Sequence, residues 1–308
     1  MTMYDYKFGI EIELTGITRE KAASVLAETL GGTSQYVGGQ YNAYEVTLPD
    51  ERKWKVVSDA SIHTVGGYNT SVELVSPILN YHNDIDNLQE IIRMIKAAGG
   101  KTNSSCGIHI HLDGEPHNAK SLKNFINIIA SRNDLLYEAL QIEPSRMRYC
   151  QKMDARLVND IKKKKPKTEQ KIKDIWYNQK NAGTYYHYHE SRYHFLNLHS
   201  YFNGVGTVEL RGFNSSLKHA GVIKAYILLA LALNHQALTQ TKATSRRNQD
   251  ENKKFAMRIY LNRIGFIGPE MKNYREHLLK HLDGSSAWRY GYDNPKYKKN
   301  QKIDKGVN

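Results

Sequence analysis

Cysteine is scarce in this 308-residue sequence, which contains only Cys106 and Cys150. Two cysteines are too few for a disulfide framework or a structural zinc cluster. Long apolar runs are also missing, because the longest, Ile227 to Leu233, is far shorter than the ~18–20 residues that span a bilayer. The first seven residues carry acidic and aromatic side chains where a secretory signal needs a basic and then an apolar run. We therefore expect a cytoplasmic protein with no membrane partner.

Acidic residues are outnumbered, because 31 Asp and Glu stand against 44 Lys and Arg and give a formal charge of +13. Such a surplus attracts anions, including nucleotides, acidic peptides and nucleic acid. Much of it lies in residues 162–173, which hold seven lysines and one glutamate, and in the Lys/Tyr-rich stretch 285–308. A solvated surface is the simpler explanation of both stretches.

Strand and helix patterns alternate along the chain. Hydrophobic residues at 40% and charged residues at 24% suit a globular protein with a sizeable core. The patterns predict a single α+β domain whose helices cover one side of an antiparallel sheet. We assign residues 1–283 to this domain, with a lysine/tyrosine-rich insertion at about 151–190, and residues 284–308 to a basic tail that we expect to be flexible. The predicted strands are 8–14, 40–48, 54–58, 71–77, 106–113, 193–198 and 207–213, and the predicted helices are 18–30, 84–98, 122–140, 218–238, 253–264 and 269–282.

The first predicted strand places two carboxylates on one surface. Phe8, Ile10, Ile12 and Leu14 alternate with Glu11 and Glu13, so the glutamates share the polar face, about 6–7 Å apart. Like charges at that distance destabilise each other unless a cation lies between them. The alternation therefore predicts a metal ion beside Glu11 and Glu13.

Further strands repeat this design. His109 and His111 share a polar face in the strand 106–113, Glu209 and Arg211 share one in 207–213, and Glu73 lies on another short strand. Each alone could be an ordinary amphipathic strand with a solvated face. Together their carboxylates and imidazoles favour Mg²⁺, with Mn²⁺ as the alternative, over zinc. Which of the two histidines binds metal is left open.

Arginines near this pattern are candidates for binding phosphate. Arg211 points the same way as Glu209, so its guanidinium is suited to a phosphate oxygen or a transferring phosphoryl group. A structural Glu–Arg ion pair is the alternative. Arg148 and Arg192 are further candidates for binding phosphate or a substrate carboxylate, and Asn197 is a third candidate for the cofactor site.

Five motifs, in this order, resemble the amidoligase family of the glutamine synthetase and glutamate–cysteine ligase superfamily. They are Gly-Ile-Glu-Ile-Glu at 9–13, Ser-Asp-Ala-Ser-Ile at 58–62, Glu-Leu-Val-Ser-Pro at 73–77, Cys-Gly-Ile-His-Ile-His at 106–111 and Val-Glu-Leu-Arg at 208–211. The resemblance runs from about Phe8 to Ser216. It does not cover the lysine-rich insertion or the tail.

The resemblance implies a curved antiparallel sheet of glutamine synthetase-like type, with ATP and metal ions on its concave face. It implies that ATP phosphorylates a substrate carboxylate and that an amine then attacks the acyl phosphate. Carried onto this chain, Arg211 is similar to the phosphate-stabilising arginine, and Asp59 to a residue near the nucleotide or the incoming amine. The implied metal ligands are Glu11, Glu13, Glu73, one or both of His109 and His111, and Glu209.

Two other functions remain open. A metal-dependent phosphotransferase could use the same residues but would leave a stable phosphorylated product. A basic nucleic-acid-binding protein could bind phosphates through residues 162–173 and the tail, although this leaves the Glu/His pattern unexplained. For a ligase, the positive charge favours an acidic small-molecule or peptide substrate, while the oligomeric state is undetermined.

Overall fold

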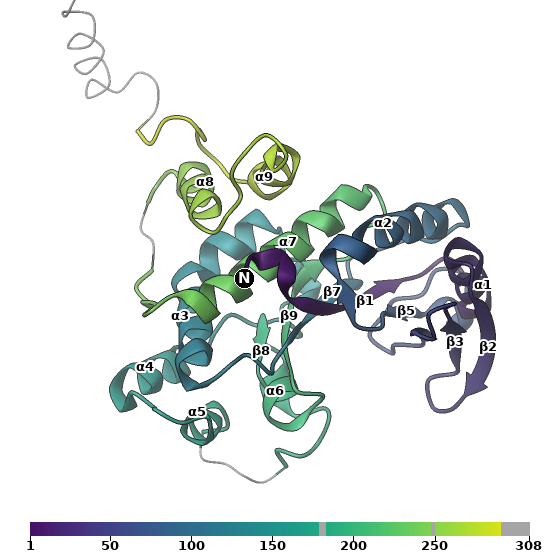
Figure 1. The fold of residues 1–308 in the computed structure, drawn as a ribbon, viewed down its shortest axis with the longest axis horizontal. Helices are drawn as coiled ribbons and strands as arrows, with labels where there is room; N and C mark the ends of the chain where they lie inside the picture. Colours follow the sequence, from purple (N-terminus) through teal and green to yellow (C-terminus); the bar gives the residue numbers. More distant parts are fainter. Residues whose placement is uncertain (179–182, 248–249, 291–308) are drawn as a thin grey trace, which may run out of the picture.

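The computed structural model describes residues 1–178, 183–247 and 250–290. Within these residues nine strands form one antiparallel sheet, in the order β2-β3-β4-β5-β1-β7-β9-β8, and β6 pairs with the start of β1 (Figure 1). The predicted α+β class with a large antiparallel sheet is confirmed. The strands are β1 (Lys7–Leu14), β2 (Thr33–Gly38), β3 (Ala43–Thr47), β4 (Lys53–Val57), β5 (Val72–Val75), β6 (Leu79–Asn80), β7 (Gly107–Asp113), β8 (Leu196–Asn197) and β9 (Thr207–Asn214).

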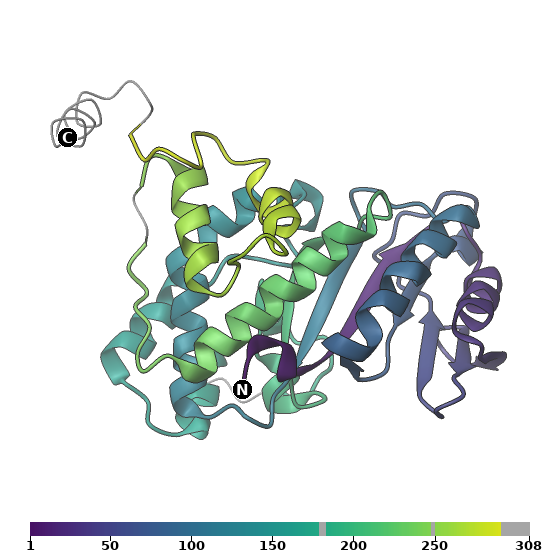
Figure 2. The same cartoon turned by 45° about the horizontal axis from the view of Figure 1, so that its top comes forward.

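Helices cover the apolar face of this sheet. In Figure 2 the long helices α2 and α7 run across it in front of β1 and β7. Pairing in register places Ile10 opposite Ile110 and Ile110 opposite Leu210, so one apolar row crosses three strands. The helices are α1 (Arg19–Leu30), α2 (Tyr81–Ala97), α3 (Ala119–Ala139), α4 (Ala155–Lys164), α5 (Glu169–Trp176), α6 (His199–Asn203), α7 (Ala220–Thr239), α8 (Lys253–Arg263) and α9 (Lys272–Leu279).

Helix α7 is the centre of the core, as its apolar sequence predicts. It has the length and hydropathy of a membrane span, yet 72% of its most apolar window is buried inside the protein. An all-round apolar helix in a globular protein must be enclosed by other elements, and here α2, α3 and α9 pack around it. The burial therefore identifies α7 as a core helix.

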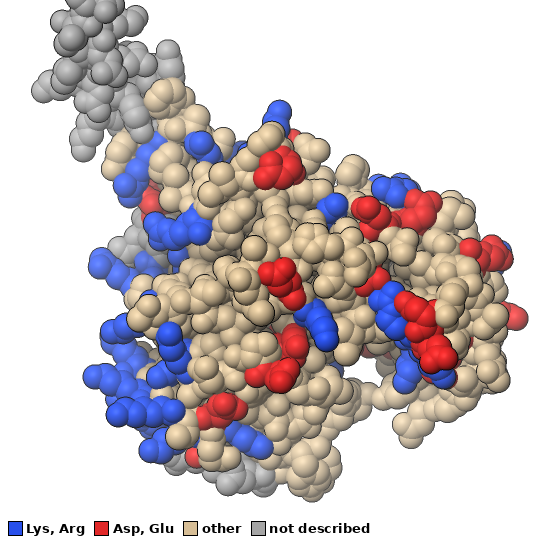
Figure 3. All heavy atoms as spheres, viewed as in Figure 1, with Lys and Arg blue, Asp and Glu red and all other residues tan. Residues whose placement is uncertain are grey.

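The lysine-rich insertion is folded where the structure describes it. Helices α4 and α5 bury an apolar stripe that includes Leu157, Ile161, Ile172 and Ile175, and both helices contact α3. The lysines of α4 are exposed, and Figure 3 shows Lys and Arg side chains gathered on the side of the molecule that carries α4. The insertion thus adds a helical layer with a basic outer surface.

Several local predictions were wrong. Strand β2 was missed because its residues are mostly exposed at the sheet edge and show no alternation. Helix α2 begins at Tyr81, three residues before the predicted start at Asp84. Asn80 is its N-cap, and Asp84 accepts a hydrogen bond from the Asn80 backbone N–H and forms an ion pair with Arg52. Helix α9 begins at Lys272, so Pro269 precedes the helix instead of occupying its first turn.

The predicted tail is described only as far as residue 290. Residues 285–289 contact α8, because the Asn252 side chain donates hydrogen bonds to the backbone oxygens of Ser285, Trp288 and Arg289. Residues 291–308, on which the rest of the tail prediction falls, lie outside the described residues.

Candidate active site

Strand pairing brings the predicted acidic and histidine residues onto one face. In the sheet, Glu11 lies opposite His109, Glu13 lies opposite Glu73, and His111 lies opposite Glu209. These pairs come from four strands, β5, β1, β7 and β9, which are neighbours in the sheet although far apart in sequence. The alternation seen in single strands therefore produces one continuous polar surface, which we call the acidic face: Glu11, Glu13, Asp59, Glu73, His109, His111, Glu209 and Arg211.

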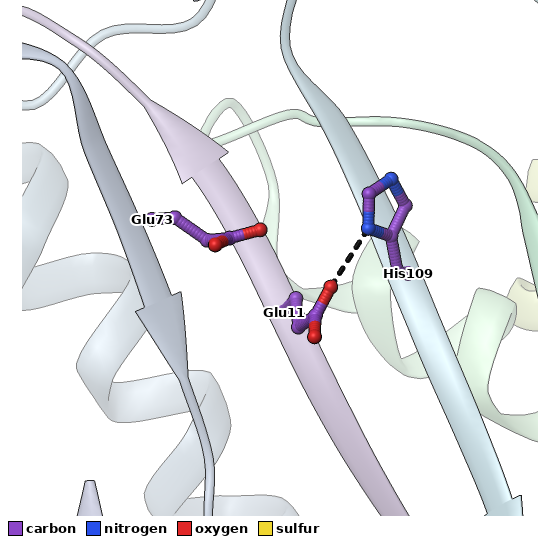
Figure 4. A group of neighbouring side chains, drawn as sticks. All are labelled: Glu11, Glu73 and His109. Atoms are coloured by element: carbon purple, nitrogen blue, oxygen red, sulfur yellow. Dashed lines mark hydrogen bonds and ion pairs between the residues drawn. The ribbon is translucent and has the colours of Figure 1, made fainter. Parts of the chain in front are cut away.

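Glu11 occupies the middle of the acidic face. Its Oε2 accepts a 2.8 Å hydrogen bond from His109 Nδ1, the contact drawn in Figure 4, where the Glu73 side chain points toward the same space. Its Oε1 lies 3.2 Å from Nε2 of His111. Although burial opposes ionisation, the adjacent His111 and the hydrogen bond from His109 hold the pKa of Glu11 well below its usual range.

His111 forms a hydrogen bond through one ring nitrogen and faces Glu11 at ion-pair distance through the other. Its Nδ1 lies 2.9 Å from the hydroxyl of Thr207, which fixes the plane of the ring. Its buried Nε2 has no hydrogen-bond partner within the described residues, despite the nearby Glu11 carboxylate. A buried nitrogen aimed at carboxylates without a hydrogen bond is typical of a metal ligand, whose other nitrogen is oriented by a neighbouring polar group.

Glu13, Glu73 and Asp59 form an acidic end of the face. Glu13 Oε2 accepts a 2.6 Å hydrogen bond from the backbone N–H of Gly107, so only its other oxygen is left for a ligand. Burial, together with the negative charges of Glu11, Glu13 and Asp59, raises the pKa of Glu73 well above its usual range. This cluster therefore concentrates more negative charge than its protein surroundings neutralise.

Arg211 supplies a positive charge at the other end of the acidic face, beside Glu209. Its Nη1 donates to Glu209 Oε1 and its Nε donates to the carbonyl of Tyr149. Burial opposes ionisation of Glu209, but the Arg211 charge and then His111 lower the pKa of Glu209 to about 2. Within the described residues no hydrogen bond is found for Arg211 Nη2, so this nitrogen is available to a ligand.

The donor set fits divalent cations. Three groups of side chains each bring their possible ligand atoms within 4.8 Å of one another: Glu11, Glu73 and His109; Glu11, His111 and Glu209; and Glu13, Asp59 and Glu73. Glu11 and Glu73 each belong to two groups, so the possible sites are contiguous. Carboxylate oxygens with one or two imidazoles suit Mg²⁺ or Mn²⁺. The buried His111 Nε2, which faces Glu11 without an aligned hydrogen bond, and the raised pKa of Glu73 agree with cations between these side chains.

The three predicted cofactor-binding residues lie in different surroundings. Asn197 is buried, donates a 2.6 Å hydrogen bond to Glu209 Oε2 and accepts one from the backbone of His199, so here it positions Glu209. Arg148 is exposed and stacks on Tyr149, and Arg192 donates to the carbonyl of His187. No ion pair joins either arginine to the acidic face within the described residues, and their roles stay predictions.

The insertion reaches the acidic face through residues 183–192. Burial and Arg192 lower the pKa of His187, while the charges of Glu209 and Glu11 oppose this shift. The Tyr188 hydroxyl lies 2.9 Å from that of Tyr41, in the turn between β2 and β3. The insertion and this hairpin therefore meet beside the site.

Sequence reasoning missed Arg146. This buried arginine donates to the backbone carbonyls of Phe213 and Arg211 at 2.7 and 3.0 Å. It passes so close to Gly107 that an added Cβ would lie 2.1 Å from Nη2 of Arg146. Gly107 in the motif Cys-Gly-Ile-His-Ile-His thus makes room for Arg146. Arg146 itself lies at the end of a short 3-10 helix, Pro144–Arg146, whose sequence gives no sign of this contact.

A cleft of about 450 Å³ opens beside the acidic face. Glu11 and His111 line one side, and Ile78 and Val205, which are 69% and 79% exposed, line its rim. The cleft therefore joins the charged centre to an apolar opening.

Residues 4–234 match the family described as "Putative amidoligase enzyme". The chain belongs to the amidoligase family. The match covers most of the chain and confirms the resemblance of the five sequence motifs. No curated protein matches this amidoligase.

Among solved structures, this amidoligase is similar to a bifunctional glutathione synthetase from Pasteurella multocida, with 15% sequence identity and a TM-score of 0.39. The similarity covers 90% of this chain and 47% of that one, so the amidoligase spans about half the length of that protein. An amidoligase joins a carboxylate to an amine, and the family therefore supports a carboxylate–amine ligase in general.

Proposed function

We propose that this protein is an ATP- and Mg²⁺-dependent ligase that forms an amide bond through an acyl phosphate. The observation that carries the proposal is the set of three contiguous acidic and histidine groups beside Arg211, in a chain of the amidoligase family. We further propose a glutamine synthetase-like sheet, a cytoplasmic location, and a catalytic domain that spans residues 1–283.

The proposed reaction has two steps. A carboxylate oxygen of the first substrate attacks the terminal phosphorus of ATP, and the bond between that phosphorus and ADP breaks. The amine nitrogen of the second substrate then attacks the acyl carbon, phosphate leaves, and the nitrogen loses a proton. Activation is required because a carboxylate and an ammonium do not condense in water.

We assign different roles in the reaction to the side chains of the acidic face. Glu11, Glu13, Glu73, His109, His111 and Glu209 would hold Mg²⁺, which when bound offsets the charge of phosphate oxygens. Arg211 directs Nη2 toward the charge that develops on the transferring phosphoryl group, because its other donors are held by Glu209 and Tyr149. Asp59 lies next to Glu13 and Glu73, where it would contribute to a metal or accept a proton from the amine.

The cleft beside Glu11 and His111 is the proposed entry for one substrate. Its apolar rim, formed by Ile78 and Val205, suits a substrate whose reacting group is polar and whose remainder is apolar. Arg148, Arg192 and Asn197 remain proposed contributors to cofactor binding, with Asn197 acting through Glu209.

The test is ADP release with Mg²⁺ against a panel of carboxylates and amines, with product masses recorded. A product whose mass equals carboxylate plus amine minus water supports the ligase. A stable product that gains only a phosphoryl group would replace the ligase with a phosphotransferase. Absence of ADP release with every pair, in protein shown to be folded, would contradict both enzymes.

A further inference from the structure

A second hollow, separate from the acidic face, lies between α3, α4 and the segment 241–247. This groove has a volume of about 1170 Å³ and shares no lining residue with the acidic face. Among the described residues that line it, Lys and Arg are frequent and Asp and Glu are absent. The basic residues of the groove are Lys120, Lys123, Lys162, Lys165, Lys242, Arg246 and Arg247.

Acidic neighbours leave most of this charge unpaired. Asp160 of α4 pairs with Lys164 and Arg156, outside the groove lining. Asp134 pairs with Lys152 and reaches Arg247 at 3.6 Å. For the other six basic residues no ion pair is found within the described chain. These side chains are therefore available to an anionic partner, on the side where Figure 3 shows the basic residues gathered.

The floor of the groove differs from its rim. Apolar side chains contribute there, and Val158 is partly exposed among them. Two amide side chains are also accessible: Asn159 is exposed, and Asn127 uses its Nδ2 to donate to the carbonyl of Ala243. An amide can both donate to and accept from a peptide backbone. The apolar residues that line the groove are Ala130, Met153, Ala155, Val158, Ile161 and Ala243.

Aromatic residues are absent from the described lining of the groove. Proteins that bind single-stranded nucleic acid stack bases on aromatic side chains, and such a platform is missing here. A basic rim over an apolar floor instead complements an acidic chain that also carries apolar side chains. This combination distinguishes the groove from a simple phosphate-binding surface.

We propose that this groove binds an acidic peptide segment of a partner protein. The peptide carboxylates pair with Lys123, Lys162 and Arg246, and its apolar side chains contact Val158. The peptide backbone bonds to the asparagine amides. This binding is separate from the ligase chemistry, because it uses none of the residues of the acidic face.

The test measures binding of a fluorescently labelled Glu-Glu-Leu repeat peptide to the full chain by anisotropy. The groove variant K123E/K162E/R246E is compared with K21E/K272E/K280E, which makes the same change in net charge at exposed lysines elsewhere. We expect the groove variant to bind about tenfold more weakly, since three charge pairs are lost, and the control to change less than about twofold. Equal affinity of the two variants would overturn the proposal.

A second comparison separates peptide from nucleic acid. Val158→Ser should weaken peptide binding about threefold, because it removes apolar contact, and should leave binding of a mixed-sequence single-stranded DNA unchanged. Tighter binding of the DNA than of the peptide, together with no effect of Val158→Ser on the peptide, would assign the groove to nucleic acid instead. If the triple variant does not fold, as judged by circular dichroism, Lys162→Glu on exposed α4 replaces it, and an unchanged peptide affinity then contradicts the proposal.

Discussion

Glu13 on β1 lies directly opposite Glu73 on β5, and Asp59 adds a third carboxylate within 4.8 Å of both. The pairing brings like charges together in a partly buried place, which costs free energy unless a cation lies between them. Burial, and then the charges of Glu11, Glu13 and Asp59, raise the pKa of Glu73 well above its usual range. Three acids at one place oppose stability, and this arrangement supports the proposed metal binding.

Glu73→Gln should stabilise the metal-free protein, because it removes one buried negative charge without changing the size of the side chain. We expect its melting temperature in EDTA to rise by about 2 °C or more. Glu28→Gln, an exposed change on α1, is the matched control and should leave the melting temperature unaltered. A lower melting temperature of Glu73→Gln in EDTA would contradict the proposed charge repulsion.

Glu11→Gln should weaken the response to metal. Glu11 belongs to two of the three ligand groups, so its loss affects both. We expect Mg²⁺ or Mn²⁺ to raise the melting temperature of the variant less than that of the unaltered protein, because the group Glu13, Asp59 and Glu73 remains, and ADP release to fall about 100-fold or more. Equal thermal shifts in both proteins would locate the metal elsewhere.

Arg211→Lys tests the phosphate-binding role while keeping a positive charge beside Glu209. Lysine cannot reproduce the separate donors to Glu209, Tyr149 and a ligand. We expect kcat for ADP release to fall about 100-fold with a smaller change in KM for ATP, because the contact strengthens as charge develops. A purely structural Glu–Arg pair would instead lower the melting temperature and leave kcat nearly unchanged.

The same substitution at buried Arg146 and at exposed Arg148 tests what the Arg146 hydrogen bonds contribute to stability. Arg146→Met leaves the carbonyls of Arg211 and Phe213 without their donor, so the free energy of unfolding should fall by about 3 kcal/mol. The same change at exposed Arg148 should alter it by less than about 0.5 kcal/mol. Urea denaturation measures both, and equal effects would show that the Arg146 hydrogen bonds contribute little.

Alternation within single strands was sufficient to predict much of the acidic face. Glu11, Glu13, His109, His111, Glu209 and Arg211 could be assigned to polar faces because the side-chain period of a strand is two residues. Their cross-strand partners could not, since register depends on contacts between segments distant in sequence. The pairing of Glu13 with Glu73 and the bond from Asn197 to Glu209 therefore became known only from the structure.

The buried stripe of the insertion and the basic groove could not be predicted from the amino-acid composition. Seven lysines fall within residues 162–173, so the buried stripe of Leu157, Ile161 and Ile172 was interpreted as part of a polar insertion. The basic groove could not be predicted either, because it combines α3, α4 and residues 241–247. Charge counts showed an excess of lysine but not where its side chains meet.

The most direct test of the proposed chemistry uses a substrate carboxylate labelled with ¹⁸O in both oxygens, in the presence of ATP, Mg²⁺ and the amine. Attack by a carboxylate oxygen on the terminal phosphorus transfers that oxygen to the phosphate that the amine later displaces. We predict that mass spectrometry will find one ¹⁸O atom in the released phosphate for each amide formed. Unlabelled phosphate, or label in AMP, would contradict the acyl-phosphate mechanism.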